Sequence, residues 1–263
     1  MIFRYPGAKT KWADTITWQL MPFLKKEFTD IFVGGGSVIC HIAKLFPKLK
    51  INANDLDFNM YCFWNLVARG RDHELKELFR LLGQRPTIEL FESLRSSKSE
   101  NEVKCAYKAI FFNRTTFSGI STCGPIGGFA QKSKWKIDCR YNFVKMKTKI
   151  IEMKELFAGR LTVTNFDFER ALVDSIMYLD PPYYKKGNEL YKHKMSHSDH
   201  VRLSNKLREH KLWLLSYDNC EEVTSLYSGY DAQAMKKRYS ISGKKKEWAE
   251  KSELLIFSEG LKQ

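Results

Sequence analysis

A glycine-rich turn between a strand and a helix constrains the fold of this chain more than any other feature. Residues 30–33 form a short apolar run that ends in Gly34-Gly35-Gly36, and a helix is expected over residues 38–45. A second strand is expected over residues 50–54, ahead of an aromatic-rich helix around residues 58–66. Strand, helix and strand in this order make a βαβ unit, which implies a parallel sheet.

The alternation of strands and helices resumes in the second half of the chain. Strands are expected over residues 161–163, 175–179 and 212–216, and residues 232–241 and 253–257 are expected to pair as an antiparallel edge. The pattern predicts an α/β fold, Rossmann-like, with a mostly parallel sheet. Residues 67–149 read instead as an inserted, largely helical region, so residues 1–66 and 150–263 are expected to form one domain around it.

The charge of the chain is strongly positive and unevenly distributed. The formal net charge is +14, and residues 101–150 hold ten Lys or Arg residues against two acids. Aromatic residues are interleaved with these cations, as in surfaces that meet phosphates and bases. A solvated basic face is the alternative. Nucleic acid is therefore the favoured partner, and the charge alone does not separate DNA from RNA. No membrane partner is expected, and the protein is expected to be a monomer or weak dimer.

Several classes of protein are disfavoured by the sequence. No uncharged apolar run reaches the length of a membrane helix, and residues 1–6 contain no signal-peptide core, so a cytoplasmic protein is expected. The six cysteines include no C-x-x-C pair, and no cluster of ligating residues is evident. We therefore expect neither a disulfide framework nor a bound metal.

The glycine turn is a candidate cofactor site. Glycines let the backbone approach a ligand closely, and the following helix directs N–H groups toward it. Asp55 stands 20 residues beyond Gly35, at the end of the next strand, where a carboxylate can accept hydrogen bonds from a ribose. A dinucleotide fingerprint would require glycine in place of Ile39. A nucleoside cofactor without a pyrophosphate is therefore favoured, and a plain turn is the alternative.

The tetrad Asp180-Pro181-Pro182-Tyr183 follows an apolar strand and carries the most chemical information. Asp180 lies at the carboxyl edge of the expected sheet, the two prolines remove backbone donors, and Tyr183 adds an aromatic plane. A carboxylate and a carbonyl that accept the hydrogens of an exocyclic amine would hold its nitrogen in line with an electrophilic carbon. A strand end with a proline turn is the alternative.

Several motifs together resemble the Dam-type DNA N6-adenine methyltransferases, and the resemblance covers nearly the whole chain. The motifs are Phe3-Arg4-Tyr5-Pro6-Gly7-Ala8-Lys9, residues 32–38, residues 112–120, residues 124–128, Arg140-Tyr141-Asn142 and the tetrad. The resemblance implies a methyltransferase sheet with a target-recognition insertion at residues 67–149. It also implies transfer of a methyl group from S-adenosylmethionine to the N6 amine of an adenine that is flipped out of the duplex.

The resemblance implies roles for individual residues, carried over by position. The cofactor-binding residues would be Tyr5, Lys9, Gly34, Gly36, Asp55 and Asp180. The catalytic residues would be Asp180, Pro181, Pro182 and Tyr183, with Tyr183 stacked on the flipped base. The DNA-binding residues would be Asn113, Arg114, Phe117, Lys132, Lys134, Lys136 and Arg140, with Phe117 as a wedge.

One departure from the family concerns sequence specificity. Relatives that read GATC carry an arginine where this chain has Ser121-Thr122-Cys123, and arginine is the side chain that best fits guanine. We therefore expect a short adenine-containing site other than GATC, or a relaxed set that contains it. Methylation of RNA adenine or protein glutamine, and a non-catalytic DNA-binding homologue, are the alternative functions.

Overall fold

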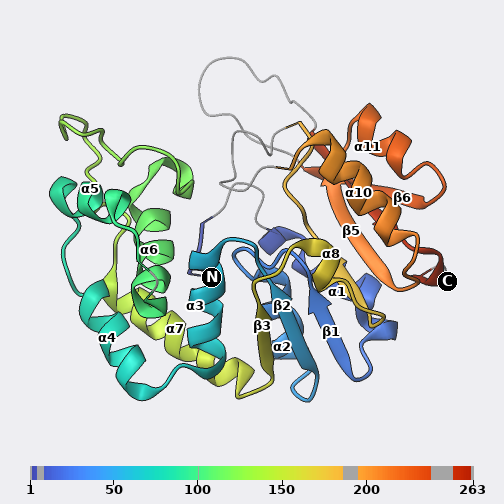
Figure 1. Ribbon diagram of the computed structural model, residues 1–263, viewed down its shortest axis with the longest axis horizontal. Coiled ribbons are helices and arrows are strands. Elements are labelled where there is room, and N and C mark those ends of the chain that lie inside the picture. Colours follow the sequence, from blue (N-terminus) through green and yellow to red (C-terminus); the bar gives the residue numbers. More distant parts are fainter. Residues whose placement is uncertain (1, 5–8, 100, 186–194, 238–250, 262–263) are drawn as a thin grey trace.

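The computed structural model describes residues 2–4, 9–99, 101–185, 195–237 and 251–261, and Figure 1 shows their arrangement. A seven-stranded sheet with the order β3-β2-β1-β4-β5-β7-β6 forms the centre of the molecule. The first five strands in this order run parallel, whereas β7 is antiparallel to both β5 and β6. This confirms the predicted mostly parallel sheet with an antiparallel edge. The strands are β1 (Glu27–Asp30), β2 (Lys50–Asn54), β3 (Leu161–Thr164), β4 (Met177–Leu179), β5 (Trp213–Asp218), β6 (Asp231–Lys237) and β7 (Lys251–Phe257).

Helices cover both faces of the sheet, and a separate group of helices lies beyond its β3 edge (Figure 1). Helices α1 (Ala13–Leu20), α2 (Ser37–Leu45), α3 (Phe58–Arg69) and α7 (Phe143–Phe157) pack on one face, and α8 (Phe168–Ala171), α10 (His197–Leu207) and α11 (Glu221–Leu226) on the other. The separate group consists of α4 (Asp72–Leu82), α5 (Ile88–Ser96) and α6 (Glu102–Thr115).

Alternation along the central strands divides the apolar side chains between two cores. Tyr178 joins the core beneath α1, α2, α3 and α7, whereas its neighbours Met177 and Leu179 join the core beneath α8, α10 and α11. Successive side chains of a strand point to opposite faces, so a strand buried on both sides is apolar throughout. This is why β4 and β5 read as continuous apolar runs in the sequence.

The inserted helices share a core with the sheet. Phe111 of α6 and Ile51 of β2 belong to one continuous cluster of buried residues. The predicted domain boundaries, at 66/67 and 149/150, fall inside α3 and α7, so both helices extend from the sheet into the insertion. The division into two domains stays a prediction.

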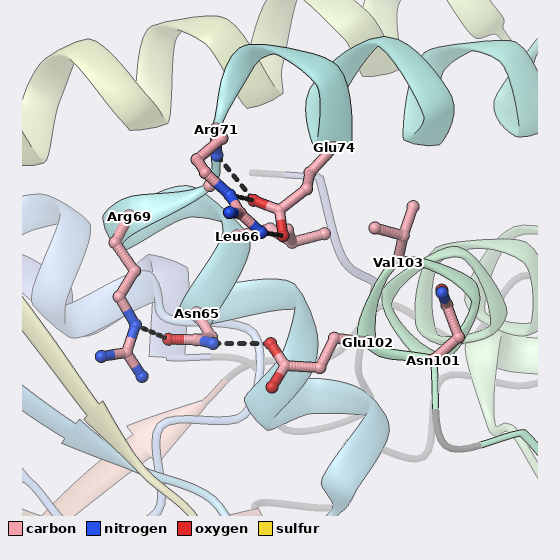
Figure 2. A pocket seen from close by; sticks show the side chains of 9 residues that line it. Asn65, Leu66, Arg69, Arg71, Glu74, Asn101, Glu102 and Val103 are labelled. Atoms are coloured by element: carbon pink, nitrogen blue, oxygen red, sulfur yellow. Dashed lines mark hydrogen bonds and ion pairs between the residues drawn. The ribbon is translucent and has the colours of Figure 1, made fainter.

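A shallow polar pocket marks the point where α3, α4 and α6 meet (Figure 2). Asn65 of α3 donates to Glu102 of α6 at 2.7 Å and accepts a hydrogen bond from Arg69 at 2.5 Å. Because Asn65 is buried, this amide needs both partners. The chain of hydrogen bonds ties the inserted helices to the helix that follows β2.

The structure shifts one predicted strand. Strand β1 ends at Asp30, whereas the sequence predicted a strand over residues 30–33. The backbone still bonds to both neighbouring strands beyond Asp30, since Ile31 N–H donates to Tyr178 O and Val33 N–H donates to Asn54 O. Residues 31–33 therefore extend the edge of the sheet into the glycine turn. None of the helices in the described part of the chain is long and apolar enough to cross a membrane.

Candidate functional site

The carboxyl ends of the parallel strands bring several acidic residues to one edge of the sheet. The chain order reverses between β1 and β4, which makes this edge a switch point of the kind where α/β proteins bind ligands. Asp30 ends β1, Asp55 follows β2 and Asp180 follows β4. Asp180 and Asp55 both lie close enough to Asp30 to raise its pKa by charge repulsion.

The glycine turn is fixed to Asp55 by backbone hydrogen bonds. Gly34 N–H donates to Asp55 Oδ2 at 3.0 Å, and Asp57 N–H donates to Asp55 Oδ1 at 2.9 Å. Asp55 is half-buried. These two hydrogen bonds orient its carboxylate at the turn.

Gly36 allows the turn to approach α3. Its φ is +68°, and a Cβ atom at this position would stand 2.1 Å from Cζ2 of Trp64. Trp64 also donates from Nε1 to Gly34 O at 2.9 Å. Only glycine satisfies both the left-handed backbone and this contact. Gly34 differs, because among the residues that the structure describes a Cβ there would meet only Phe32 O, at the ordinary contact distance of 3.9 Å.

Lys9 links the N-terminal segment to the tetrad. Its Nζ donates to both carboxylate oxygens of Asp180, at 2.6 and 2.8 Å, and to Tyr183 OH at 2.8 Å. The Lys9 side chain is 3% exposed, whereas that of Asp180 is 21% exposed. The ammonium is thus buried behind a carboxylate that can still be reached from outside.

Glu253 of β7 completes this group and was not predicted from the sequence as a site residue. Tyr183 OH donates to Glu253 Oε2 at 2.7 Å, and the same oxygen lies 3.6 Å from Lys9 Nζ. Glu253 is 9% exposed. The buried Lys9 ammonium therefore lies between two carboxylates, and Tyr183 is held by its hydroxyl.

Burial shifts the protonation of these acids and of Tyr183. Desolvation raises the pKa of Asp180, and the Lys9 ammonium opposes that rise. At Asp30, burial and the neighbouring Asp180 raise the pKa well above the usual range, although the Lys9 ammonium opposes that rise as well. Burial also raises the pKa of Tyr183, which keeps its hydroxyl protonated as a donor.

A second acid missed by the sequence analysis shapes the turn after the tetrad. Asp218, at the end of β5, accepts hydrogen bonds from the N–H groups of Tyr184 at 3.0 Å and Lys185 at 2.9 Å. Pro181 is buried and Pro182 half-buried in the same turn. The turn that carries Tyr183 is therefore held from the next strand of the sheet.

The structure brings together most of the residues predicted for the cofactor and the chemistry. Lys9 and Asp180 are in direct contact, and Gly34 and Asp55 are in direct contact at the same sheet edge. Tyr5 lies outside the described residues. No group of three or more potential ligands for a metal ion occurs in the part of the chain that the structure describes, so the absence of a metal stays a prediction.

The residues predicted to contact DNA fall into exposed and buried sets. Phe117 is 70% exposed, and Lys132, Lys134, Lys136 and Arg140 are also exposed. Lys134 Nζ lies 5.7 Å from the ring centroid of Trp135, which is exposed as well. Cations and aromatic rings thus share the surface of the segment between α6 and α7.

Asn113 and Arg114 are placed differently from the prediction. Asn113 is 3% exposed, and its amide bonds to the backbone of Arg4 and Gly119 at 2.9–3.0 Å. The guanidinium of Arg114 is largely buried and donates to Ile2 O. Both side chains therefore hold the N-terminal segment, and Asn113 offers no free surface to DNA. The reason is that α6 is buried on nearly all sides.

Comparison with known proteins identifies the family. Residues 5–241 match the model of the D12 class N6 adenine-specific DNA methyltransferases. The Type II methyltransferase M.MjaIII of Methanocaldococcus jannaschii is 23% identical over 92% of each chain. The Type II methyltransferase M.CviBI of Paramecium bursaria Chlorella virus NC1A is 22% identical over 90% of each chain.

Solved structures give a more distant likeness. A precorrin-6y C5,15-methyltransferase from Geobacter metallireducens is 9% identical, with a TM-score of 0.40, over 97% of this chain and 91% of that chain. The assignment therefore rests on the family match. This match agrees with the presence of the Asp180–Tyr183 tetrad and the glycine turn at one edge of the sheet. The chain belongs to the D12 class N6 adenine-specific DNA methyltransferases.

Proposed function

We propose that Asp180 and Tyr183 act on the N6 amine of an adenine flipped out of double-stranded DNA, with S-adenosylmethionine as methyl donor. The observation that carries this proposal is the network of Lys9, Asp180, Tyr183 and Glu253 at the switch point of the sheet. It presents a carboxylate and an aromatic ring at the edge where the glycine turn and Asp55 also lie.

Asp180 supplies the acceptor that the amine requires. The lone pair of an exocyclic amine is delocalised into the base, and hydrogen bonds from its N–H groups to fixed acceptors make the nitrogen a better nucleophile. S-adenosylmethionine supplies an electrophilic methyl carbon when it is bound. With the donor bound, the nitrogen would form its bond to the methyl carbon while the carbon–sulfur bond breaks and the neutral thioether leaves. The Asp180 carboxylate would stabilise the positive charge that develops on the nitrogen, and the surplus proton of the amine would pass to solvent.

Lys9 can stay in place during this step. Its ammonium donates one hydrogen bond to each Asp180 oxygen, and each carboxylate oxygen has a second lone pair that an incoming amine can use. Tyr183 OH and Glu253 remain as partners of the ammonium. Lys9 therefore keeps Asp180 ionised, and Glu253 keeps Lys9 in place when the base enters.

The residues around the glycine turn fit a nucleoside cofactor. Among the described residues, no atom lies closer than 3.9 Å to a Cβ placed on Gly34, and Asp55 is oriented at the same turn by two backbone N–H groups. We propose that Asp55 accepts hydrogen bonds from the ribose hydroxyls. The carboxylate of Asp180, within reach of Asp30, lies at the same edge.

Removal of the Asp55 carboxylate is expected to weaken cofactor binding. Asp55→Ala should reduce the free energy of S-adenosylmethionine binding by about 1.5–3 kcal/mol, the range for hydrogen bonds to a charged group. Isothermal titration calorimetry measures this binding free energy. Asp57→Ala is the matched control, because Asp57 caps α3 through Asn59 N–H. An unchanged dissociation constant in Asp55→Ala would show that Asp55 only organises the turn.

We propose that the segment between α6 and α7 meets DNA. Phe117 and Trp135 are exposed, Lys134 lies beside Trp135, and exposed rings of this kind can stack on bases or enter the duplex. Burial lowers the pKa of Arg114, and the nearby cations Arg4 and Arg140 lower it further. Such a cluster of like charges is stabilised by a polyanion.

The lysines of this segment are expected to contribute to affinity for every sequence. Replacement of Lys132, Lys134 and Lys136 by Gln should lower DNA affinity and reduce the log–log slope against salt by about 0.9 per lost phosphate contact. Fluorescence anisotropy at several salt concentrations measures the slope. Lys25, Lys26 and Lys48, which are exposed before β1 and β2 at the opposite sheet edge, provide the control triple variant. Equal slopes in the two variants would place the three lysines away from DNA.

Substrate class can be tested directly. Purified protein with radiolabelled S-adenosylmethionine should label double-stranded DNA. After this DNA is digested to nucleosides, the label should be found in N6-methyl-2′-deoxyadenosine. RNA and protein fractions in parallel reactions should stay unlabelled. Label in RNA or protein in place of DNA would refute the proposed substrate.

A further inference from the structure

The guanidinium of Arg95, on α5, is bound to the backbone of the loop that follows α6. It donates to Ser121 O at 2.9 Å, to Thr122 O at 3.0 Å and to Cys123 O at 2.8 Å. Three consecutive carbonyls are thus held by one side chain. A planar fork with five donors can satisfy such a set, whereas a lysine ammonium is a compact charge without that geometry.

Two aromatic rings fix the position of this guanidinium. Its central carbon lies 4.8 Å from the ring centroid of Phe91 and 4.9 Å from that of Phe112. Both rings are buried, with exposures of 1% and 6%, and they pack edge to face at 5.3 Å. Arg95 therefore rests on the rigid junction of α5 and α6, and cation–π contact favours this placement.

Two backbone hydrogen bonds close the base of this loop, and Arg95 binds the backbone of its tip. Phe117 N–H donates to Gly124 O at 3.2 Å, and Ile126 N–H donates to Thr115 O at 2.8 Å. Between these bonds, residues 117–123 form the tip, which carries the exposed Phe117. The carbonyls of residues 121–123 are turned toward Arg95, which fixes the backbone that presents Phe117, Ser121 and Thr122.

We propose that Arg95 is a positioning residue for sequence specificity, which holds the 117–123 tip in one conformation for contact with bases and does not itself contact DNA. The proposal rests on the proposed function, since it requires the tip to meet DNA. A loop ordered before binding loses less conformational entropy on binding, and base contacts need a precisely placed backbone. Arg95 is itself an exposed residue, and its guanidinium is bound to the three carbonyls of the loop.

Arg95→Lys tests this, because it keeps the charge and loses the fork. Methylation of a randomised oligonucleotide library should show that the preference for the best site over single-base variants falls at least about fivefold, the equivalent of one weakened base contact. The rate at the best site and the dissociation constant of S-adenosylmethionine should change far less. Arg85→Lys is the matched control, since Arg85 is 83% exposed and pairs with Asp138 on the surface of the same region.

Arg95→Ala with chemical rescue separates positioning from general damage to the fold. Addition of methylguanidinium, which can occupy the space between the two rings, should restore the site preference, whereas methylammonium should not. If Arg95→Ala loses the site preference and neither compound restores it, the substitution merely disrupts the junction of α5 and α6. That result would overturn the proposal.

A direct phosphate contact gives a different result. In that case Arg95→Lys would keep the site preference, and Arg95→Met would reduce the log–log salt slope by about 0.9. That outcome, with a wild type that methylates DNA selectively, would overturn this proposal alone. A wild type that does not methylate DNA would overturn the proposed function and this inference with it.

Discussion

Asp180→Ala is expected to lower the single-turnover rate of DNA methylation by at least about 10²-fold, the loss typical when a preorganised group at the reacting centre is removed. Asp180 lies at the switch point, its side chain is reachable from outside, and Lys9 holds its charge. DNA affinity should change far less, because the exposed cations lie on the segment between α6 and α7.

Asp174→Ala is the matched control for this experiment. Asp174 precedes the same strand at its opposite end, and its side chain is 98% exposed. Rapid-quench assays and DNA binding are measured on both variants. A rate near that of wild type in Asp180→Ala would remove Asp180 from the mechanism, whatever the result for Asp174.

Lys9→Met is expected to lower the free energy of unfolding by about 3–5 kcal/mol at neutral pH, because it leaves buried carboxylates without their cation. The Lys9 side chain is 3% exposed and contacts Asp180 and Glu253. Urea denaturation measures the loss, and Lys11→Met, at an exposed position two residues away, is the control. Equal stability of the two variants would contradict the role given to Lys9.

The Lys9→Met variant should also differ from wild type in how its stability and activity depend on pH. Burial already raises the pKa of Asp180, and loss of the Lys9 ammonium should raise it further. A carboxyl with a raised pKa binds its proton more tightly in the folded state, so the deficit of Lys9→Met should be largest at high pH and shrink as pH falls through that pKa. Turnover needs the ionised carboxylate, so the acid limb of the rate profile should move to higher pH.

The parts of the site that are continuous in the chain could be predicted from the sequence. The glycine turn and the tetrad are each continuous in the chain, and each follows a strand, so their place at the carboxyl edge follows from a parallel sheet. The pairing of Lys9 with Asp180 is not local. It was predicted only as a shared role in the family, and the structure provides the contact.

Glu253, Asp218 and Arg95 were missed because their partners are distant in the chain. Glu253 acts on Tyr183, 70 residues earlier, through a strand that runs antiparallel to its neighbours. The sequence held a signal for two of them. Glu253 is an acid at the start of an apolar run that was expected to be a strand, and Asp218 is a further acid at a strand end. Arg95 gave none, since an arginine near a helix end usually reads as a solvated side chain.

Asn113 was assigned to DNA by its position in the family motif, and periodicity alone does not show whether a helix is buried on most sides or half-exposed. Helix α6 carries buried residues at Ala106, Tyr107, Ala109 and Ile110, on more than one side. Tertiary packing of the insertion, which the sequence does not show, decides that the Asn113 amide points into the protein.

Methylation-aware long-read sequencing of DNA from a host that expresses the protein tests the central claim most directly. In cells with the wild type, the account predicts N6-methyladenine at a short motif other than GATC, or at a relaxed set of motifs that contains GATC. With Asp180→Ala it predicts none above background. Modified cytosine in place of adenine, or adenine methylation that persists in Asp180→Ala, would contradict it.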